Sequence, residues 1–206
     1  MNEKYDALTA LRKSLADSLS EKLTAKLKEL AMSGARFSVD FRKEEGVFSS
    51  NGNDDVTFLF SANIGEELKP LSKIISGGEL SRLMLAIKTV SGRNVDCFTY
   101  IFDEIDAGIS GNAAFTVAEN FAQIALNRQI IAVSHLPQIV AMADNSIYIY
   151  KETLGDRTYT QIKPLSDNEK VGEVIRLIGG KMGDESSFVH AKNLIDQATA
   201  YKNSIN

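Results

Sequence analysis

The sequence of 206 residues contains one cysteine, no tryptophan and three prolines. One cysteine cannot close an internal disulfide, which argues against a small secreted domain held together by crosslinks. Cys97 stands before Phe98 with no adjacent cation, so we predict a buried thiol in a reducing compartment rather than a reactive nucleophile. The sequence also lacks a basic-then-apolar leader and any apolar run of membrane-spanning length, which predicts a cytoplasmic protein without membrane contacts.

An excess of positive charge is missing as well. The formal net charge is -4, so the chain as a whole has no electrostatic attraction for nucleic acid, and any DNA contact must be local or supplied by another segment. Hydrophobic residues make up 44% of the sequence, enough for one sizeable core. We therefore expect one compact domain with at most one appended element.

The first part of the sequence predicts one long amphipathic helix from Glu3 to Met32. Leucines recur there at helical spacing, at positions 8, 11, 15, 19, 23, 27 and 30. Two interpretations stay open. The helix packs on its own domain, or it is the end of a coiled coil that enters a globular head.

The rest of the sequence predicts an α/β fold. Alternating apolar residues at Arg36–Phe41 and Val56–Ser61 predict a β-hairpin. After Pro70, helical and apolar strand segments alternate, which is typical of a parallel sheet. Strands are expected at 98–102, 130–133, 146–151 and 158–163, and helices at 112–126, 169–178 and 185–201. A further helix after Ser76 is expected to pack through Leu80, Leu83, Met84, Ile87 and Val90, with Arg82 and Lys88 solvated.

The segment Ser76–Glu79, here called the glycine loop, precedes that helix and has the sequence Ser-Gly-Gly-Glu. Paired glycines permit a close approach of the backbone to a ligand, and the first turn of a helix attracts anions such as phosphate. The alternative is a capping box, in which Ser76 caps the helix and Glu79 reaches back to it. Taken alone, the segment favours the capping box.

Two adjacent carboxylates, Asp103 and Glu104, follow an apolar strand. Successive side chains of a strand point to opposite faces, so the two acids cannot perform the same task. One can hold Mg²⁺ while the other activates an attacking water as a general base. A solvated strand end is the alternative, but placing two acids beside a buried strand has a desolvation cost unless they are paired.

His135 also follows an apolar strand. The carboxyl ends of parallel strands meet at one edge of a sheet, so this side chain is expected near Asp103 and Glu104. A single histidine at a strand end is more often structural. Its place after the glycine loop and the carboxylates favours a functional role.

The order and spacing of these three segments resemble the later part of an ABC-type nucleotide-binding domain, with signature motif, Walker B, D-loop and switch histidine in sequence. Within that superfamily the chain resembles the SMC-like RecN family over nearly its whole length. The stretches that carry this likeness are Leu59–Asn63, Ile64–Glu66, Leu68–Leu71, Ser76–Arg82 and Asp103–Gly111.

The resemblance implies that ATP is held between two heads of a homodimer. Ser76, Gly77, Gly78 and Glu79 would then complete the ATP site of the partner head. In its own head, Asp103 would assist Mg²⁺ coordination, Glu104 would activate water and His135 would sense the γ-phosphate. The family's activity is ATP-driven repair of DNA double-strand breaks, so the full protein is expected to contact DNA and associate with the nucleoid.

Two departures from the family pattern matter. The usual D-loop aspartate falls at Ser110, and Asp106 is a candidate for part of its role. The sequence also lacks a phosphate-binding P-loop, Gly-x-x-x-x-Gly-Lys followed by Ser or Thr. The resemblance places that loop in an amino-terminal lobe, which returns through a coiled coil.

We therefore predict part of a longer protein that is inactive as an ATPase by itself. Residues 1–32 would be the returning coiled-coil helix, and residues 33–206 the carboxyl-terminal lobe of the head, with a mostly parallel sheet. Two alternatives stay open. One is a fragment of another ABC-type nucleotide-binding domain, such as that of a transporter, and the other is a non-catalytic dimerisation or docking module.

Overall fold

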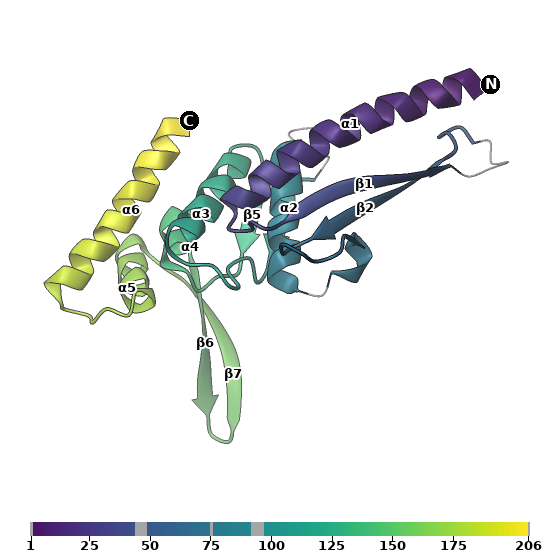
Figure 1. The fold of residues 1–206 in the computed structure, drawn as a ribbon. Helices are drawn as coiled ribbons and strands as arrows, with labels where there is room; N and C mark the ends of the chain where they lie inside the picture. Colours follow the sequence, from purple (N-terminus) through teal and green to yellow (C-terminus); the bar gives the residue numbers. More distant parts are fainter. Residues whose placement is uncertain (1, 44–48, 75, 92–96, 206) are drawn as a thin grey trace. The chain divides into compact units, whose positions relative to one another are not determined.

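The computed structural model describes residues 2–43, 49–74, 76–91 and 97–205. Two compact units make up the chain (Figure 1). The first contains residues 1–96 and 103–107, and the second contains residues 97–102 and 108–206. None of the described helices combines the length and the low polarity needed to cross a membrane.

The first unit is a long helix on a small antiparallel sheet. Its elements are α1 (Asn2–Glu29), β1 (Arg36–Lys43), β2 (Asp54–Ser61), β3 (Lys69–Pro70), the 3-10 helix η1 (Leu71–Lys73) and α2 (Gly77–Ser91). Strands β1 and β2 pair in antiparallel register from Arg36 opposite Ser61 to Lys43 opposite Asp54. Helix α1 packs on β1 and on α2. The predicted hairpin and both predicted helices are confirmed.

The leucine stripe of α1 is buried only toward its carboxyl end. Leu23, Leu27 and the following Leu30 are fully buried, whereas Leu11 is 58% exposed and Leu15 is 61% exposed. The carboxyl-terminal half of the helix therefore buries its leucines in its own unit. Leu11 and Leu15 lie on one exposed face, because residues four apart are on the same side of a helix.

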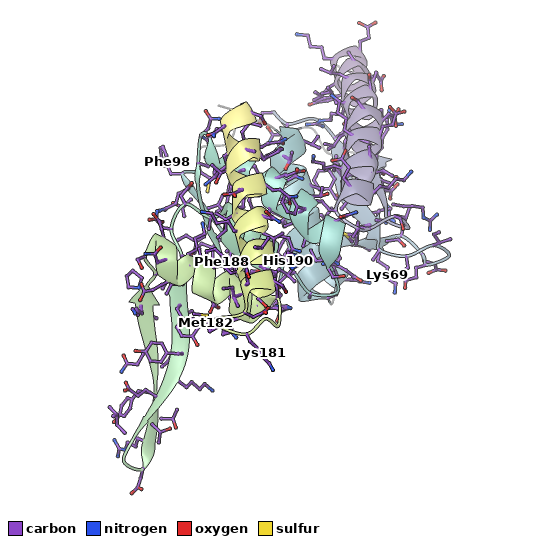
Figure 2. All side chains as sticks on the ribbon, turned by 90° about the vertical axis from the view of Figure 1, so that its left-hand side faces the viewer. Lys69, Phe98, Lys181, Met182, Phe188 and His190 are labelled. Carbon is purple, nitrogen blue, oxygen red and sulfur yellow. The ribbon has the colours of Figure 1, made fainter. Side chains whose placement is uncertain are left out.

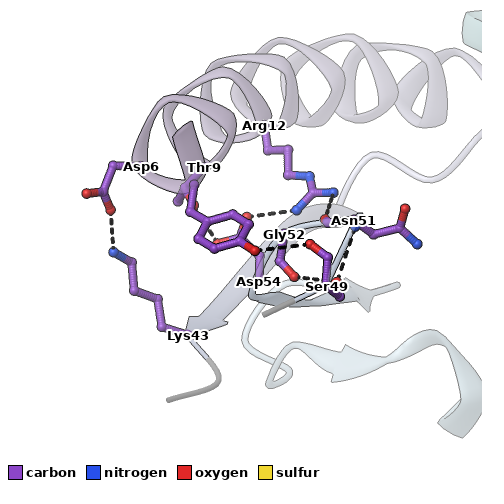
Figure 3. Close-up of polar contacts among 9 residues, drawn as sticks. Asp6, Thr9, Arg12, Lys43, Ser49, Asn51, Gly52 and Asp54 are labelled. Carbon is purple, nitrogen blue, oxygen red and sulfur yellow. Dashed lines mark hydrogen bonds and ion pairs between the residues drawn. The ribbon is translucent and has the colours of Figure 1, made fainter. Parts of the chain in front are cut away.

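A polar clamp joins α1 to the β1–β2 hairpin (Figure 3). The Asp54 carboxylate accepts hydrogen bonds from Thr9 Oγ1 at 2.7 Å and from Arg12 Nη1 at 2.9 Å. The Asp54 side chain is only 1% exposed, so its charge depends on these partners. The hydrogen bond from Thr9, assisted by Arg12, lowers the pKa of Asp54 below its ordinary value.

Replacing Asp54 by Asn is expected to lower the free energy of unfolding near neutral pH by about 1–3 kcal/mol, because the change weakens a buried, charge-assisted pair. Since the folded-state pKa of Asp54 is depressed, the stabilisation by its carboxylate is present above about pH 4 and is lost as the pH falls through the folded-state pKa. Urea unfolding at neutral and at acidic pH measures the difference.

The gap in stability between the wild type and Asp54→Asn should narrow at acidic pH. Asp40→Asn is the control, because the Asp40 side chain is 41% exposed and pairs with Arg42 at the surface. An equal gap at both pH values would contradict a stabilisation that depends on the Asp54 charge.

The second unit begins with a parallel strand pair. Its elements are β4 (Thr99–Phe102), α3 (Gly111–Ala125), β5 (Gln129–Ala132), α4 (Pro137–Met142), β6 (Ile147–Leu154), β7 (Arg157–Pro164), α5 (Asp167–Leu177) and α6 (Glu185–Ile205). Strands β4 and β5 are parallel, and α3 connects them. Phe102 packs on Phe121 of α3 with ring centroids 5.0 Å apart, and both side chains are buried.

The expectation of a mostly parallel sheet is met only in part. Among the described residues, only β4 and β5 pair in parallel, and both other sheets are antiparallel. The reason for β6 and β7 is the length of their connection. Gly155 and Asp156 alone join them, and Gly155 has a φ of 63°. Such a short turn allows only antiparallel pairing, whereas parallel strands need a crossover of a dozen or more residues.

The burial predicted for the cysteine is wrong. Cys97 is half-buried, and its Sγ lies 3.2 Å from the carbonyl oxygen of Thr99, to which the thiol donates. Strand β4 begins at Thr99, so Cys97 lies outside the strand and is not covered with it. Phe98, which comes between, is 84% exposed and projects outward (Figure 2).

Candidate functional site

Only Ser76 of the glycine loop precedes α2, and Gly77–Glu79 already belong to the first turn of the helix, one turn earlier than expected. Ser76 and Gly77 are exposed, whereas Gly78 is buried. Ser76 Oγ accepts a long hydrogen bond of 3.4 Å from the Glu79 backbone N–H, which is one half of the capping box considered above. The capping interaction leaves the Ser76 side chain at the surface, so capping and phosphate contact are compatible.

The segment Asp103–Ala107, here called the carboxylate loop, is a tight turn that follows β4. Glu104 adopts a φ of 55°, a left-handed conformation that is unfavourable for a residue with a side chain. Asp103 Oδ1 accepts a hydrogen bond of 2.9 Å from the Glu104 backbone N–H, and Ala107 N donates to Glu104 O at 3.1 Å. Both carboxylates are exposed. A strained backbone conformation of this kind is found more often at functional sites than elsewhere.

The glycine loop and the carboxylate loop lie against each other in the first unit. A Cβ atom added to Gly77 would overlap Oε2 of Glu104, so the Glu104 carboxylate lies directly over this glycine. A Cβ on Gly78 would come within 2.8 Å of the Ala107 Cβ and 3.0 Å of the Glu104 carbonyl oxygen. Gly78 therefore permits an approach of the two loops that a larger residue would obstruct, whereas a larger residue at Gly77 would displace the end of the Glu104 side chain.

Arg82 is buried rather than solvated, which corrects the expectation from the sequence. Its side chain is only 7% exposed overall, and its guanidinium reaches the carboxylate loop. The predicted apolar face of α2 is also partly wrong. Leu80 is 39% exposed and Met84 is 36% exposed, whereas Leu83 and Leu85 are fully buried. The α2 helix turns the side of Gly78, Arg82 and Leu85 inward because the carboxylate loop packs there.

Asp106 and Ser110 have different environments. Asp106 is 5% exposed, so it reaches another molecule only if the carboxylate loop opens. Ser110 is exposed and is the N-cap residue of α3 in the second unit. A role for either residue across a dimer stays a prediction.

The strands that precede Asp103 and His135 end level with each other. Phe102 is opposite Ala132, and the Val133 backbone N–H donates to the Phe102 carbonyl at 2.9 Å. This confirms that the two strands end at the same edge of a parallel sheet. His135 itself is exposed and belongs to the second unit, whereas Glu104 belongs to the first, so their meeting stays a prediction.

One face of the β4–β5 sheet is apolar and exposed. Ile101 pairs with Ile131, and alternation along the strand directs both side chains away from the face of Phe102. Ile101 is 71% exposed, Ile131 is 46% exposed and the following Val133 is 52% exposed. Parallel strands in proteins normally have both faces covered. This sheet face, defined by Ile101, Ile131 and Val133, is therefore a surface suited to a partner.

The donors present fit a shared nucleotide and Mg²⁺ only if phosphate supplies further ligands. Mg²⁺ in nucleotide sites is held by one or two carboxylates together with phosphate oxygens and water. Asp103 is exposed and meets the requirement for a carboxylate. Within the part of the chain that the structure describes, no three His, Cys, Asp or Glu side chains gather as a complete metal site.

Comparison with known proteins agrees with the sequence motifs. The chain is 44% identical over 199 residues to the DNA repair protein RecN of Halalkalibacterium halodurans, which covers 95% of this chain and 35% of that protein. It is 41% identical over 209 residues to RecN of Bacillus subtilis, covering 95% of the chain and 36% of the relative. The resemblance to RecN is confirmed. The chain spans about a third of the length of these RecN relatives.

The fold of the chain also resembles that of solved SMC heads. The Smc head domain with a coiled coil and joint from Pyrococcus yayanosii matches 84% of this chain and 31% of that structure, with a TM-score of 0.56 and 20% identity. At this identity the likeness concerns the fold alone. No family model matches the chain.

Proposed function

We propose that this chain is the carboxyl-terminal half of an SMC-like ATPase head in a RecN-type DNA repair protein. Together with a lobe that carries a P-loop, it would bind and hydrolyse MgATP across a pair of heads to drive the repair of DNA double-strand breaks. The observation that carries the proposal is the packing of the glycine loop on the carboxylate loop. It combines two motifs with phosphate-binding and water-activating chemistry in one body.

In the proposed mechanism the chain's residues position and polarise rather than form covalent bonds, as in other phosphoryl transfers. Ser76 and the first amides of α2 would face the nucleotide phosphates of the partner head. Asp103 would hold Mg²⁺, which neutralises charge on the phosphates when bound. Glu104 would take a proton from the attacking water, and His135 would contact the γ-phosphate.

The exposed sheet face supports the proposal of a missing lobe. Burying Ile101, Ile131 and Val133 under another element would complete the two-sided cover that parallel strands require. About two thirds of the RecN relatives' length lies outside the matched part, which is enough chain for such a lobe. The exposed side chains of Leu11 and Leu15 on α1 likewise suit a coiled-coil partner from that remainder.

The test is to produce this chain with and without the remainder of the protein and to measure phosphate release from MgATP. The chain alone is expected to show no turnover, since it lacks the lysine and amides of a P-loop. Turnover should appear when the remainder is present. Turnover by the chain alone would contradict the proposal, and a stable assembly without any turnover would favour the docking module.

A substitution in the sheet face tests the same proposal by weakening the expected contact between this chain and the remainder of the protein. Ile131→Asp is expected to weaken co-elution of the two parts by about tenfold or more, because it would bury an unpaired charge in the interface. Ile64→Asp is the control, since Ile64 is 85% exposed in the first unit and has no part in the proposed interface. Equal co-elution of both variants with the remainder would show that the sheet face is not the contact.

A further inference from the structure

The α2 helix holds the carboxylate loop at three backbone carbonyls. Ser81 Oγ donates to the Asp103 carbonyl at 2.7 Å, just before Glu104. Arg82 Nη1 donates to the Ala107 carbonyl at 2.6 Å and more weakly to the Ile105 carbonyl at 3.4 Å. Both donors come from the first turns of α2, directly after the glycine loop. The loop that carries Glu104 is therefore fastened to the helix that carries the signature glycines.

Burying the Arg82 guanidinium costs free energy, which is unusual for a residue that would only hold a loop in place. Its side chain is 7% exposed, and among the described residues its Nε atom has no hydrogen-bond partner. Burial lowers the pKa of Arg82, with Glu79 opposing the shift. Taking a charge out of water costs free energy unless well-placed partners compensate for the lost hydration. The cost points to a requirement for a long, charged donor, because a single nitrogen, Nη1, reaches the carbonyls of both Ala107 and Ile105.

We propose that Arg82 is a positioning residue that couples two ATP sites. It links the glycine loop, which completes the ATP site of the partner head, to the general base Glu104, which acts on the ATP of its own head. The inference rests on the proposed function, in which the glycine loop completes the partner's site while Glu104 acts in its own. The Glu104 carboxylate lies over Gly77, so a phosphate arriving at the glycine loop repels it. Because Arg82 and Ser81 hold the backbone of the carboxylate loop, that repulsion redirects the side chain of Glu104 instead of displacing the whole loop.

The consequence is cooperativity between the two ATP sites of a head pair. Engagement of ATP by the glycine loop of one head would release Glu104 of the same head from Gly77 for catalysis at its own ATP. A fastener with a purely structural role would lower stability when removed, without changing how turnover depends on the MgATP concentration.

The experiment uses the full-length protein with three variants. Arg82→Lys retains the charge, but its side chain is one bond shorter, which draws the donor away from the Ala107 and Ile105 carbonyls. Ser81→Ala removes the bond to the Asp103 carbonyl with little change in volume. Arg42→Lys is the matched control, because the Arg42 side chain is 78% exposed and pairs only with surface Asp40 in the described contacts. Steady-state phosphate release over a range of MgATP concentrations gives kcat, KM and the sigmoidal character, while equilibrium binding gives the MgATP affinity.

Arg82→Lys is expected to lower kcat by about tenfold and to turn a sigmoidal MgATP dependence into a hyperbolic one, with MgATP affinity nearly unchanged. Ser81→Ala should change both quantities in the same direction by a smaller factor, and Arg42→Lys should change neither. If Arg82→Lys does not fold, as judged by circular dichroism, Ser81→Ala decides alone. A wild-type kcat and an unchanged curve shape in the folded variants would overturn the coupling, as would a hyperbolic wild type or a change in KM alone.

A Glu104→Gln variant in the same series separates this inference from the proposed function. If Glu104→Gln lost turnover while Arg82→Lys and Ser81→Ala behaved like the wild type, the proposed coupling would be contradicted and the proposed function would stand. Full turnover in Glu104→Gln would remove the proposed role of the general base, and the coupling with it.

Discussion

Replacing Glu104 by Gln in the full-length protein is expected to lower ATP turnover by about 10²–10⁴-fold, the usual contribution of a positioned general base. Gln has almost the same shape, so it should keep the left-handed backbone of Glu104 and its contact with Gly77. Only the charge and the ability to accept a proton are lost. MgATP should still bind, because the proposed P-loop lobe and Asp103 are untouched.

Phosphate release measures the loss, and equilibrium binding of MgATP separates chemistry from binding. Glu67→Gln is the control, since Glu67 is an exposed carboxylate of the same unit, outside both loops. Turnover of Glu104→Gln within about twofold of the wild type would exclude Glu104 as the general base. Loss of binding together with turnover would instead indicate a structural role for the carboxylate.

Most elements of the fold could be predicted from sequence because their patterns are local. The alternation that predicted Arg36–Phe41 and Val56–Ser61 places side chains on two faces of a hairpin, and the structure has β1 and β2 there. The direction of pairing was harder to predict. A helix, α3, separates β4 from β5, whereas β6 and β7 follow each other with two residues between them, and this difference in connection distinguishes the antiparallel pair from the parallel one.

The candidate site was predicted in its parts but not in its assembly. The glycine loop and the adjacent acids are visible as residue types next to a helix and a strand. Their mutual packing depends on contacts across more than 20 positions, for which a single sequence carries no periodic signal. Arg82 illustrates the limit. A basic residue on a helix is usually solvated, and only the carbonyls of the carboxylate loop make its burial favourable.

One signal for Arg82 was nevertheless present. A helix that buries Gly78 leaves room for a neighbouring backbone, and the residue four positions later, Arg82, lies on the same face. A long donor at that place can satisfy carbonyls of whatever backbone approaches the glycine. In this chain Gly78 and Arg82 mark the packed face of α2, whereas Leu80 and Met84, which were expected to pack, are exposed.

The carboxylate loop lies close to Gly78, so a substitution at this glycine is expected to have a large effect on stability and turnover. Replacing Gly78 by Ala is expected to lower the free energy of unfolding by about 1–3 kcal/mol, because the new methyl group would crowd Ala107 and the Glu104 carbonyl. Neither obstacle is the free end of a flexible side chain, so the carboxylate loop has to move. A displacement of about 1 Å there should also lower turnover of the full-length protein by about 10²-fold.

Gly172 in α5 offers a matched control for the same substitution. A Cβ added there would meet the flexible end of Met182 at 3.5 Å, an ordinary contact. Gly172→Ala should therefore be neutral or raise the free energy of unfolding by up to about 1 kcal/mol, because alanine favours a helix interior. Urea unfolding compares the two variants, and phosphate release reports on the carboxylate loop. If Gly78→Ala proved as stable and as active as Gly172→Ala, the two loops would not pack through this glycine in solution, and the coupling of α2 to Glu104 would lose its structural basis.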